Sequence, residues 1–128
     1  MRDRPTGDEL LDLARDILRG DLLAHVPADK KYQALMVANA MAIAARQMRA
    51  GDGPARDQLA DLAALYGEAV PDGDPAAACR ALYARLSADI RAGRFDPGRP
   101  GHDAARALVR AQAAQKVRES NPKYLDRA

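Results

Sequence analysis

Hydrophobic and polar positions along this chain repeat with the period of an α-helix. The longest near-continuous apolar run is residues 32–48, YQALMVANAMAIAARQM, which contains no Pro or Gly and few β-branched residues. Ala, Leu and Met are strong helix formers, whereas strands favour Val, Ile, Thr and aromatic residues. The run therefore predicts a helix over about residues 30–49. Because it is apolar on nearly all sides, we expect this helix to be central, with other helices packed around it.

The two sides of the predicted central helix differ in the size and polarity of their side chains. One side carries small or flexible residues that let a neighbouring backbone approach closely, namely Ala34, Ala38, Met41 and Ala45. The opposite stripe, at helical spacing, includes three polar residues, Tyr32, Asn39 and Arg46. Either this polar line forms the floor of a ligand pocket, or Tyr32 and Arg46 reach water at the helix ends and Asn39 is a single buried amide.

Start and stop signals predict four further helices. The start signals are a capping box of Thr6 and Glu9, Pro54 in a first helical turn, the pair Asp74–Pro75, and Asp103 as an N-cap. The stop signals are Pro27, Gly67, Gly93 and the pair Asn121–Pro122. No segment has the period of a strand. We therefore expect a single all-α domain over residues 1–128, a bundle of about five helices, in which residues 1–5 and 121–128 are loosely docked tails.

The composition supports a folded chain and narrows the classes of partner. At 128 residues the chain is long enough for one modest core, and 48% hydrophobic with 30% charged residues is ordinary for a globular protein. The net charge is +2, and acidic and basic residues are interspersed. Because there is no basic block and no aromatic interleaving, we expect no nucleic-acid partner.

The single cysteine and the first residues bear on location. Cys79 excludes an intramolecular disulfide and fits a reducing compartment, and its place on an apolar stripe predicts a buried, inert thiol. The opening MRDRPTGDELL carries acidic residues and no apolar stretch, so we expect no signal peptide. Asn39 and Arg46 interrupt the apolar run, which argues against a membrane span. The expected location is the cytoplasm.

No set of residues matches a catalytic, metal or cofactor motif. His25 and His102 lie far apart, and neither has a Cys or His at ligand spacing, so no metal and no cofactor are expected. No nucleophile–base pair is visible, which disfavours an enzyme. The Gly-rich segment before the fifth helix contains four arginines, Arg91, Arg94, Arg99 and Arg106. It is either a solvated loop or an anion site built from arginine side chains and backbone N–H groups at a helix start.

Three segments carry a resemblance to a known family: RPTGDELLDLAR at residues 4–15, MVANAMAIAARQ at residues 36–47, and NPKYL at residues 121–125. With them the chain resembles a family of small uncharacterised bacterial all-helical proteins, a domain of unknown function. The resemblance also implies a genomic neighbourhood, since genes of such proteins are often found beside those of aminoglycoside-phosphotransferase-like kinases and acyl-CoA dehydrogenases. The resemblance implies an accessory role in acyl-CoA or small-molecule metabolism and carries over no catalytic residue.

Two hypotheses about function follow. The first is a non-enzymatic helical interaction module that assembles with itself or with a metabolic enzyme through the Ala/Met side of the central helix. The second is a binding protein for an acyl or phosphate-bearing small ligand. Its candidate residues are Tyr32, Asn39 and Arg46, together with Arg94 and Arg99.

Overall fold

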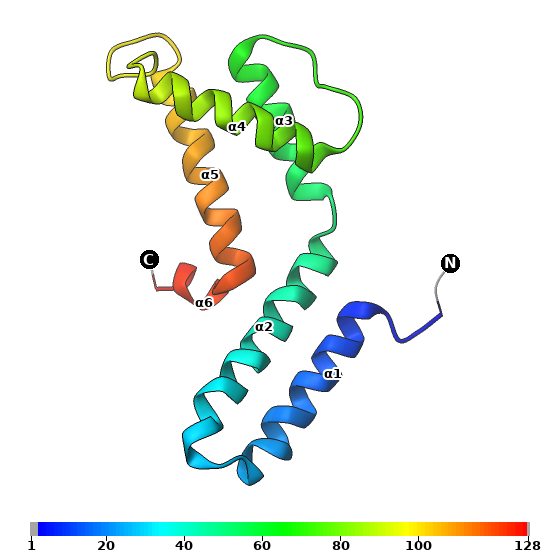
Figure 1. Ribbon diagram of the computed structural model, residues 1–128. Helices are drawn as coiled ribbons and strands as arrows, with labels where there is room; N and C mark the ends of the chain where they lie inside the picture. Colours follow the sequence, from blue (N-terminus) through cyan, green and yellow to red (C-terminus); the bar gives the residue numbers. More distant parts are fainter. Residues whose placement is uncertain (1–2, 128) are drawn as a thin grey trace. The chain divides into compact units, whose positions relative to one another are not determined.

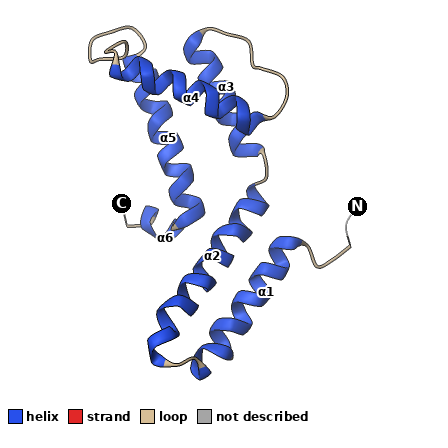
Figure 2. Cartoon of the chain, viewed as in Figure 1, coloured by secondary structure: helices blue, strands red, loops and turns tan. Residues whose placement is uncertain are grey.

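The computed structural model of the chain describes residues 3–127, and within that range it is helical without any strand (Figure 2). In chain order the elements are α1 (Gly7–Gly20), the 3₁₀ turns η1 (Leu22–His25) and η2 (Ala28–Lys30), α2 (Lys31–Ala50), α3 (Gly53–Tyr66), α4 (Pro75–Arg91), α5 (His102–Ser120) and the short α6 (Pro122–Leu125) (Figure 1). The predicted all-α class is confirmed, and α1 to α5 correspond to the five predicted helices.

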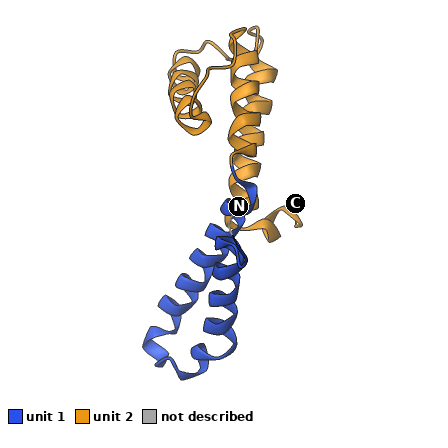
Figure 3. Cartoon of the chain, turned by 90° about the vertical axis from the view of Figure 1, so that its right-hand side faces the viewer, with its two compact units in different colours: residues 1–51 blue, residues 52–128 orange. Residues whose placement is uncertain are grey.

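The helices fall into two compact units, residues 1–51 and residues 52–128 (Figure 3). The first unit contains α1 and α2, and the second contains α3 to α6. The prediction of one domain over residues 1–128 stays a prediction. Of the predicted tails, residues 1, 2 and 128 lie outside the described residues, whereas residues 3–5 are exposed and residues 122–125 form α6.

The first unit is an antiparallel pair of helices joined by η1 and η2 (Figure 1). The predicted capping box is present at the start of α1, and in it the backbone N–H of Thr6 donates to Glu9 Oε2 at 2.8 Å. The buried residues of α2 are one stripe of alanines, Ala38, Ala42 and Ala45. As expected for a stripe of small side chains, α2 packs along it against α1. Within the described part of this unit, no larger side chain is fully buried.

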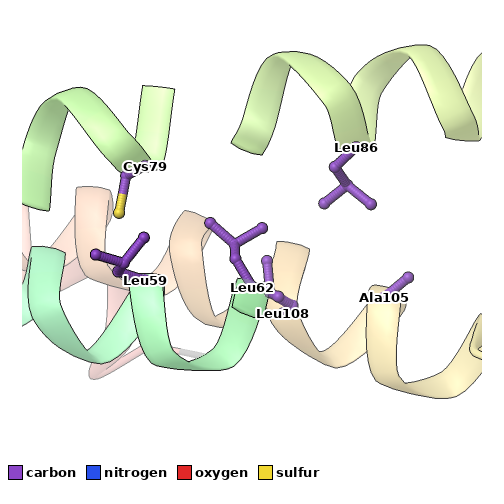
Figure 4. Close-up of a cluster of buried hydrophobic side chains, with 6 residues drawn as sticks. All are labelled: Leu59, Leu62, Cys79, Leu86, Ala105 and Leu108. Carbon is purple, nitrogen blue, oxygen red and sulfur yellow. The ribbon is translucent and has the colours of Figure 1, made fainter. Parts of the chain in front are cut away.

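The second unit holds the main hydrophobic core, formed where side chains of α4 meet those of α3 and α5 (Figure 4). Leu62 of α3 is 0% exposed and Leu86 of α4 is 1% exposed. Around them lie the other buried members of the cluster, Leu59, Cys79, Ala105 and Leu108. Sequence reasoning expected the helix over about residues 30–49 to be central, with other helices packed around it, but this cluster contains no residue of α2. The difference arises because leucines at helical spacing fill more volume per turn than the alanines of α2.

Two predicted helix starts have different outcomes. Asp74 caps α4 as predicted, since its carboxylate accepts hydrogen bonds from the backbone N–H groups of Ala76 and Ala77, both at 3.2 Å. Asp103, the predicted cap of α5, lies inside the first turn of that helix. The N-cap is Gly101, whose φ of 85° requires a residue without a Cβ clash. The chain therefore turns into α5 through backbone geometry instead of a side-chain cap.

We predict that Leu62→Ala lowers the free energy of unfolding by about 2–5 kcal/mol, because it opens a cavity among side chains that cannot collapse to fill it. Urea denaturation followed by circular dichroism measures this loss. The matched control is Leu35→Ala, because Leu35 also lies in a helix but is 40% exposed. An equal loss in the two variants would contradict the position of the core.

Candidate functional site

The five residues predicted to bind a ligand lie in both units. Tyr32, Asn39 and Arg46 form the expected line on α2, where Tyr32 is 74% exposed, Asn39 is exposed and Arg46 is half-buried. Arg94 and Arg99 lie in the loop between α4 and α5 of the second unit. The structure thus brings together the first three along one helix flank and the last two on one loop. Their joint role in binding a ligand stays a prediction.

Arg94 takes part in a polar cluster at the ends of α3 and α4. The hydroxyl of Tyr66 donates to Asp89 Oδ2 at 2.7 Å, and Arg94 Nη1 lies 3.3 Å from the same oxygen. The Arg94 guanidinium carbon also lies 5.4 Å from the centre of the Tyr66 ring. Arg94 therefore has a carboxylate partner in the last turns of α4, which explains its position without a bound anion.

Two further side chains, Arg85 and Phe95, contact the Tyr66 ring. The guanidinium carbon of Arg85 lies 3.8 Å from the centre of the Tyr66 ring, and Arg85 Nη1 pairs with Glu68 Oε1 at 2.6 Å. Phe95 approaches the ring edge-on, with 6.2 Å between the ring centres. Burial, followed by the hydrogen bond to Asp89, raises the pKa of Tyr66 to about 12. We call Tyr66, Arg85, Asp89, Arg94 and Phe95 the Tyr66 cluster.

Cys79 is buried, as predicted, and its thiol lies 3.2 Å from the carbonyl oxygen of Ala55. Burial raises the pKa of this thiol, so its nucleophilic thiolate form is disfavoured. Within residues 3–127, no group of three His, Cys, Asp or Glu side chains comes together in a way that could hold a metal ion.

On α1, three stripes of side chains run side by side. Leu11, Ala14 and Leu18 form a half-buried middle stripe, as expected for the side that packs on α2. Beside it, one flank is charged and consists of Asp8, Asp12, Arg15 and Arg19. The other flank is apolar and exposed, and consists of Leu10, Leu13 and Ile17. The apolar arc of α1 is therefore wider than the surface that α2 covers.

On α2, the buried alanine stripe also has two flanks. Val37, Met41 and Met48 recur at helical spacing on one flank, and the polar line of Tyr32, Asn39 and Arg46 lies on the other. We call the line along which α1 and α2 pack the seam. Viewed from the N-terminus of each helix, the apolar flank of α1 and the methionine flank of α2 are both rotated in the same sense away from the seam. Because the two helices are antiparallel, flanks rotated in the same sense lie on the same side of the seam. The apolar flank of α1 therefore adjoins the methionine flank of α2.

Ion pairs support this arrangement. Arg49 Nε lies 3.0 Å from Asp8 Oδ2, and the same guanidinium pairs with Asp12, so the charged flank of α1 faces the side of the seam opposite Met48. At the start of α1, a Cβ on Gly7 would collide with the end of the Met48 side chain, which confirms that α1 and Met48 are close. We define the hairpin apolar face as Leu10, Leu13, Ile17, Val37, Met41 and Met48.

Three surface cavities of the second unit are relevant to a candidate site. Two of them follow the seam between α3 and α5 and share Asp61 and Ala111, with volumes of about 450 Å³ and about 180 Å³. The third has a volume of about 240 Å³ and lies between the end of α4, the following loop and α5. Its lining combines apolar side chains with two arginines and a histidine, namely Ile90, Phe95, His102, Ala105, Arg106, Val109 and Arg110.

Comparison with known families assigns the chain to one of them. A family model described as a domain of unknown function, DUF6285, matches residues 24–124. The chain belongs to the DUF6285 family. This confirms the resemblance to a domain of unknown function, although the opening segment RPTGDELLDLAR lies before the matched range. No curated protein and no solved structure matches the chain.

The DUF6285 match spans α2 to α5, so it covers all three cavities and only the α2 half of the hairpin apolar face. Within the described residues, no helix is long and apolar enough to cross a membrane. Sequence reasoning included neither Val109 nor Arg110 in a candidate site, because the arginines that it considered ended at Arg106. The spacing of Arg106 and Arg110, four residues apart on one helix face beside Val109, was the available signal.

We predict that the Tyr66 phenol ionises with a pKa of about 12, so that the stability it supports is complete below pH 10 and is lost as the pH rises towards 12. The unfolded chain has the ordinary phenol pKa of 10.0 and therefore releases this proton more readily than the folded one. Spectrophotometric titration near the phenolate band should lose one high-pH component in Tyr66→Phe. The control Tyr32→Phe should retain that component. Loss of the same component from both variants would contradict the role of Tyr66.

Proposed function

We propose that this DUF6285 protein is a non-enzymatic interaction module that associates with a second copy of itself through the hairpin apolar face. One observation carries the proposal. Among its described residues, the first unit buries three alanines and no large side chain, while Leu10, Leu13, Ile17, Val37 and Met48 are each about half exposed. Apolar surface supplied jointly by two helices, as here, is typical of a protein interface.

Pairing of two such hairpins would form a four-helix bundle. In a symmetric dimer the same surface serves both partners, so an apolar face without fixed charges is self-complementary. The opposite side of the seam suits this role less well, because Arg49, Asp8 and Asp12 occupy it. The alanine stripe is also excluded, since α1 already covers it. The contact surface is therefore the methionine side of α2, not the alanine side that sequence reasoning grouped with it.

The expected affinity follows from the area left to bury. Completing the burial of a half-exposed aliphatic side chain contributes roughly 1 kcal/mol, which is half of the value for full burial. Ten such side chains in a dimer give on the order of 10 kcal/mol. Association itself costs about 4–15 kcal/mol in lost rigid-body freedom. The balance leaves at most about 6 kcal/mol in favour of association, which corresponds to a weak, reversible dimer with a Kd no tighter than about 40 μM.

Two finer expectations belong to this proposal and rest on sequence alone. A metabolic enzyme, such as a small-molecule kinase or an acyl-CoA dehydrogenase, is the alternative occupant of the hairpin apolar face, motivated by the family resemblance. A cytoplasmic location is motivated by the use of a single cysteine. The ligand-binding hypothesis for Tyr32, Asn39, Arg46, Arg94 and Arg99 receives no support from the cavities described above, because other residues line them.

The test uses two neighbouring residues on different flanks of α2. Val37 is 49% exposed and Met36 is 50% exposed, but only Val37 belongs to the hairpin apolar face. We predict that the wild-type protein shows a concentration-dependent monomer–dimer equilibrium in sedimentation velocity. Val37→Glu should weaken that equilibrium by at least tenfold, because it buries an unpaired charge. Met36→Glu should leave it unchanged.

Circular dichroism of both variants checks that the helices remain formed. A wild-type protein that is monomeric at all concentrations, including about 1 mM, would refute self-association. A dimer that Met36→Glu disrupts and Val37→Glu does not would place the interface on the other flank. The wild-type protein could instead be monomeric when purified alone and co-purify with a stoichiometric amount of an enzyme that Val37→Glu no longer binds. That result would identify the enzyme, and not a second copy, as the partner of the hairpin apolar face.

A further inference from the structure

The cavity of about 240 Å³ between α4 and α5 combines an apolar floor with cationic walls. Ala105 lies buried at its base, and Ile90 and Val109 expose part of their side chains towards solvent. Such exposed aliphatic groups around a hollow provide a surface from which a ligand tail displaces water. The cavity belongs wholly to the second unit and does not include the hairpin apolar face.

The aromatic wall of this cavity is fixed in place by three neighbours. Nδ1 of His102 lies 2.8 Å from the carbonyl oxygen of Phe95, which accepts the hydrogen bond. A Cβ at Gly101 would come within 3.0 Å of the Phe95 ring, so the chain passes directly over it. Tyr66 meets the same ring edge-on. Phe95 is therefore pre-positioned, and little conformational entropy is lost when a ligand packs on it.

The polar part of the cavity comes from Arg106 and Arg110 on successive turns of α5. Both side chains are exposed, and neither has an ion-pair partner among residues 3–127, although Asp103 lies one turn before Arg106. Arg49, Arg85 and Arg94 each pair with a carboxylate in the same structure. Two guanidinium groups free to bind, four residues apart on one helix face, can together hold one carboxylate by paired hydrogen bonds.

We propose that this cavity binds a small monocarboxylate with an apolar tail, the carboxylate on Arg106 and Arg110 and the tail against Phe95, Ile90 and Val109. The Nδ1–H of His102 donates to the carbonyl oxygen of Phe95, and this hydrogen bond holds the imidazole ring at the edge of the cavity. The volume of about 240 Å³ matches one short chain or one ring.

The experiment titrates the full chain, labelled with ¹⁵N, with octanoate and benzoate, and follows amide chemical shifts. Acetate is the control without a tail, and octylamine is the control without a negative charge. We expect saturable shifts in residues 90–110 for octanoate or benzoate. Acetate and octylamine should bind at least tenfold more weakly.

The variants separate the two halves of the site. Arg106→Gln combined with Arg110→Gln should weaken octanoate binding at least tenfold, and Val109→Gln should reduce the preference for octanoate over acetate. Arg80→Gln, a change of an exposed arginine on α4 that does not line the cavity, should have no effect. Because all four positions are exposed, the variants should fold, which a thermal melt verifies.

Three results would overturn the proposal: no saturable shifts with either carboxylate, shifts that persist in the double arginine variant, or equal binding of octylamine. This test is independent of the oligomeric state. Sedimentation of the Val37→Glu variant reports on self-association, whereas titration of the same variant with octanoate reports on the cavity between α4 and α5.

Discussion

The structure depends on one constraint, which is the shortage of large apolar side chains to bury. Among the described residues, the fully buried side chains of substantial volume are Leu62 and Leu86, and both lie in the second unit. In the first unit the helices meet over alanines. Alanine contacts let two helix backbones approach closely but remove little apolar area from water. The second unit can therefore form a core of its own, whereas the hairpin retains half-exposed leucine, isoleucine, valine and methionine side chains.

Much of the fold could be predicted because its determinants are local. The breakers between residues 49 and 54, the Asp74–Pro75 start and the absence of strand-period segments fix the helices to within a few residues. Local signals fail where the backbone, and not a side chain, makes the turn. Asp103 looked like a cap by residue type, but the positive φ of Gly101 starts α5. A glycine in a loop rich in glycine gives no sign of which one adopts that conformation.

The candidate sites were less predictable because they depend on which helices meet. The run at residues 32–48 is apolar all round, so its sequence cannot show which side packs on a partner. The partner proved to be α1, along Ala38, Ala42 and Ala45. Likewise, the sequence alone does not distinguish the environments of Arg94, Arg99 and Arg106. Only the approach of Phe95 and α5 separates Arg94, which pairs with Asp89, from Arg106, which lines a cavity.

The Tyr66 cluster has a consequence for motion. It ties together the last residue of α3, the last turns of α4 and the start of the α4–α5 loop, through one hydroxyl, one carboxylate and two stacked guanidinium groups. A loop with two prolines and two glycines between residues 94 and 101 would ordinarily open independently of the helices. Here it cannot open without releasing Phe95 from Tyr66. The loop and the ends of both helices should therefore exchange their amide hydrogens as one cooperative unit, with a single opening free energy.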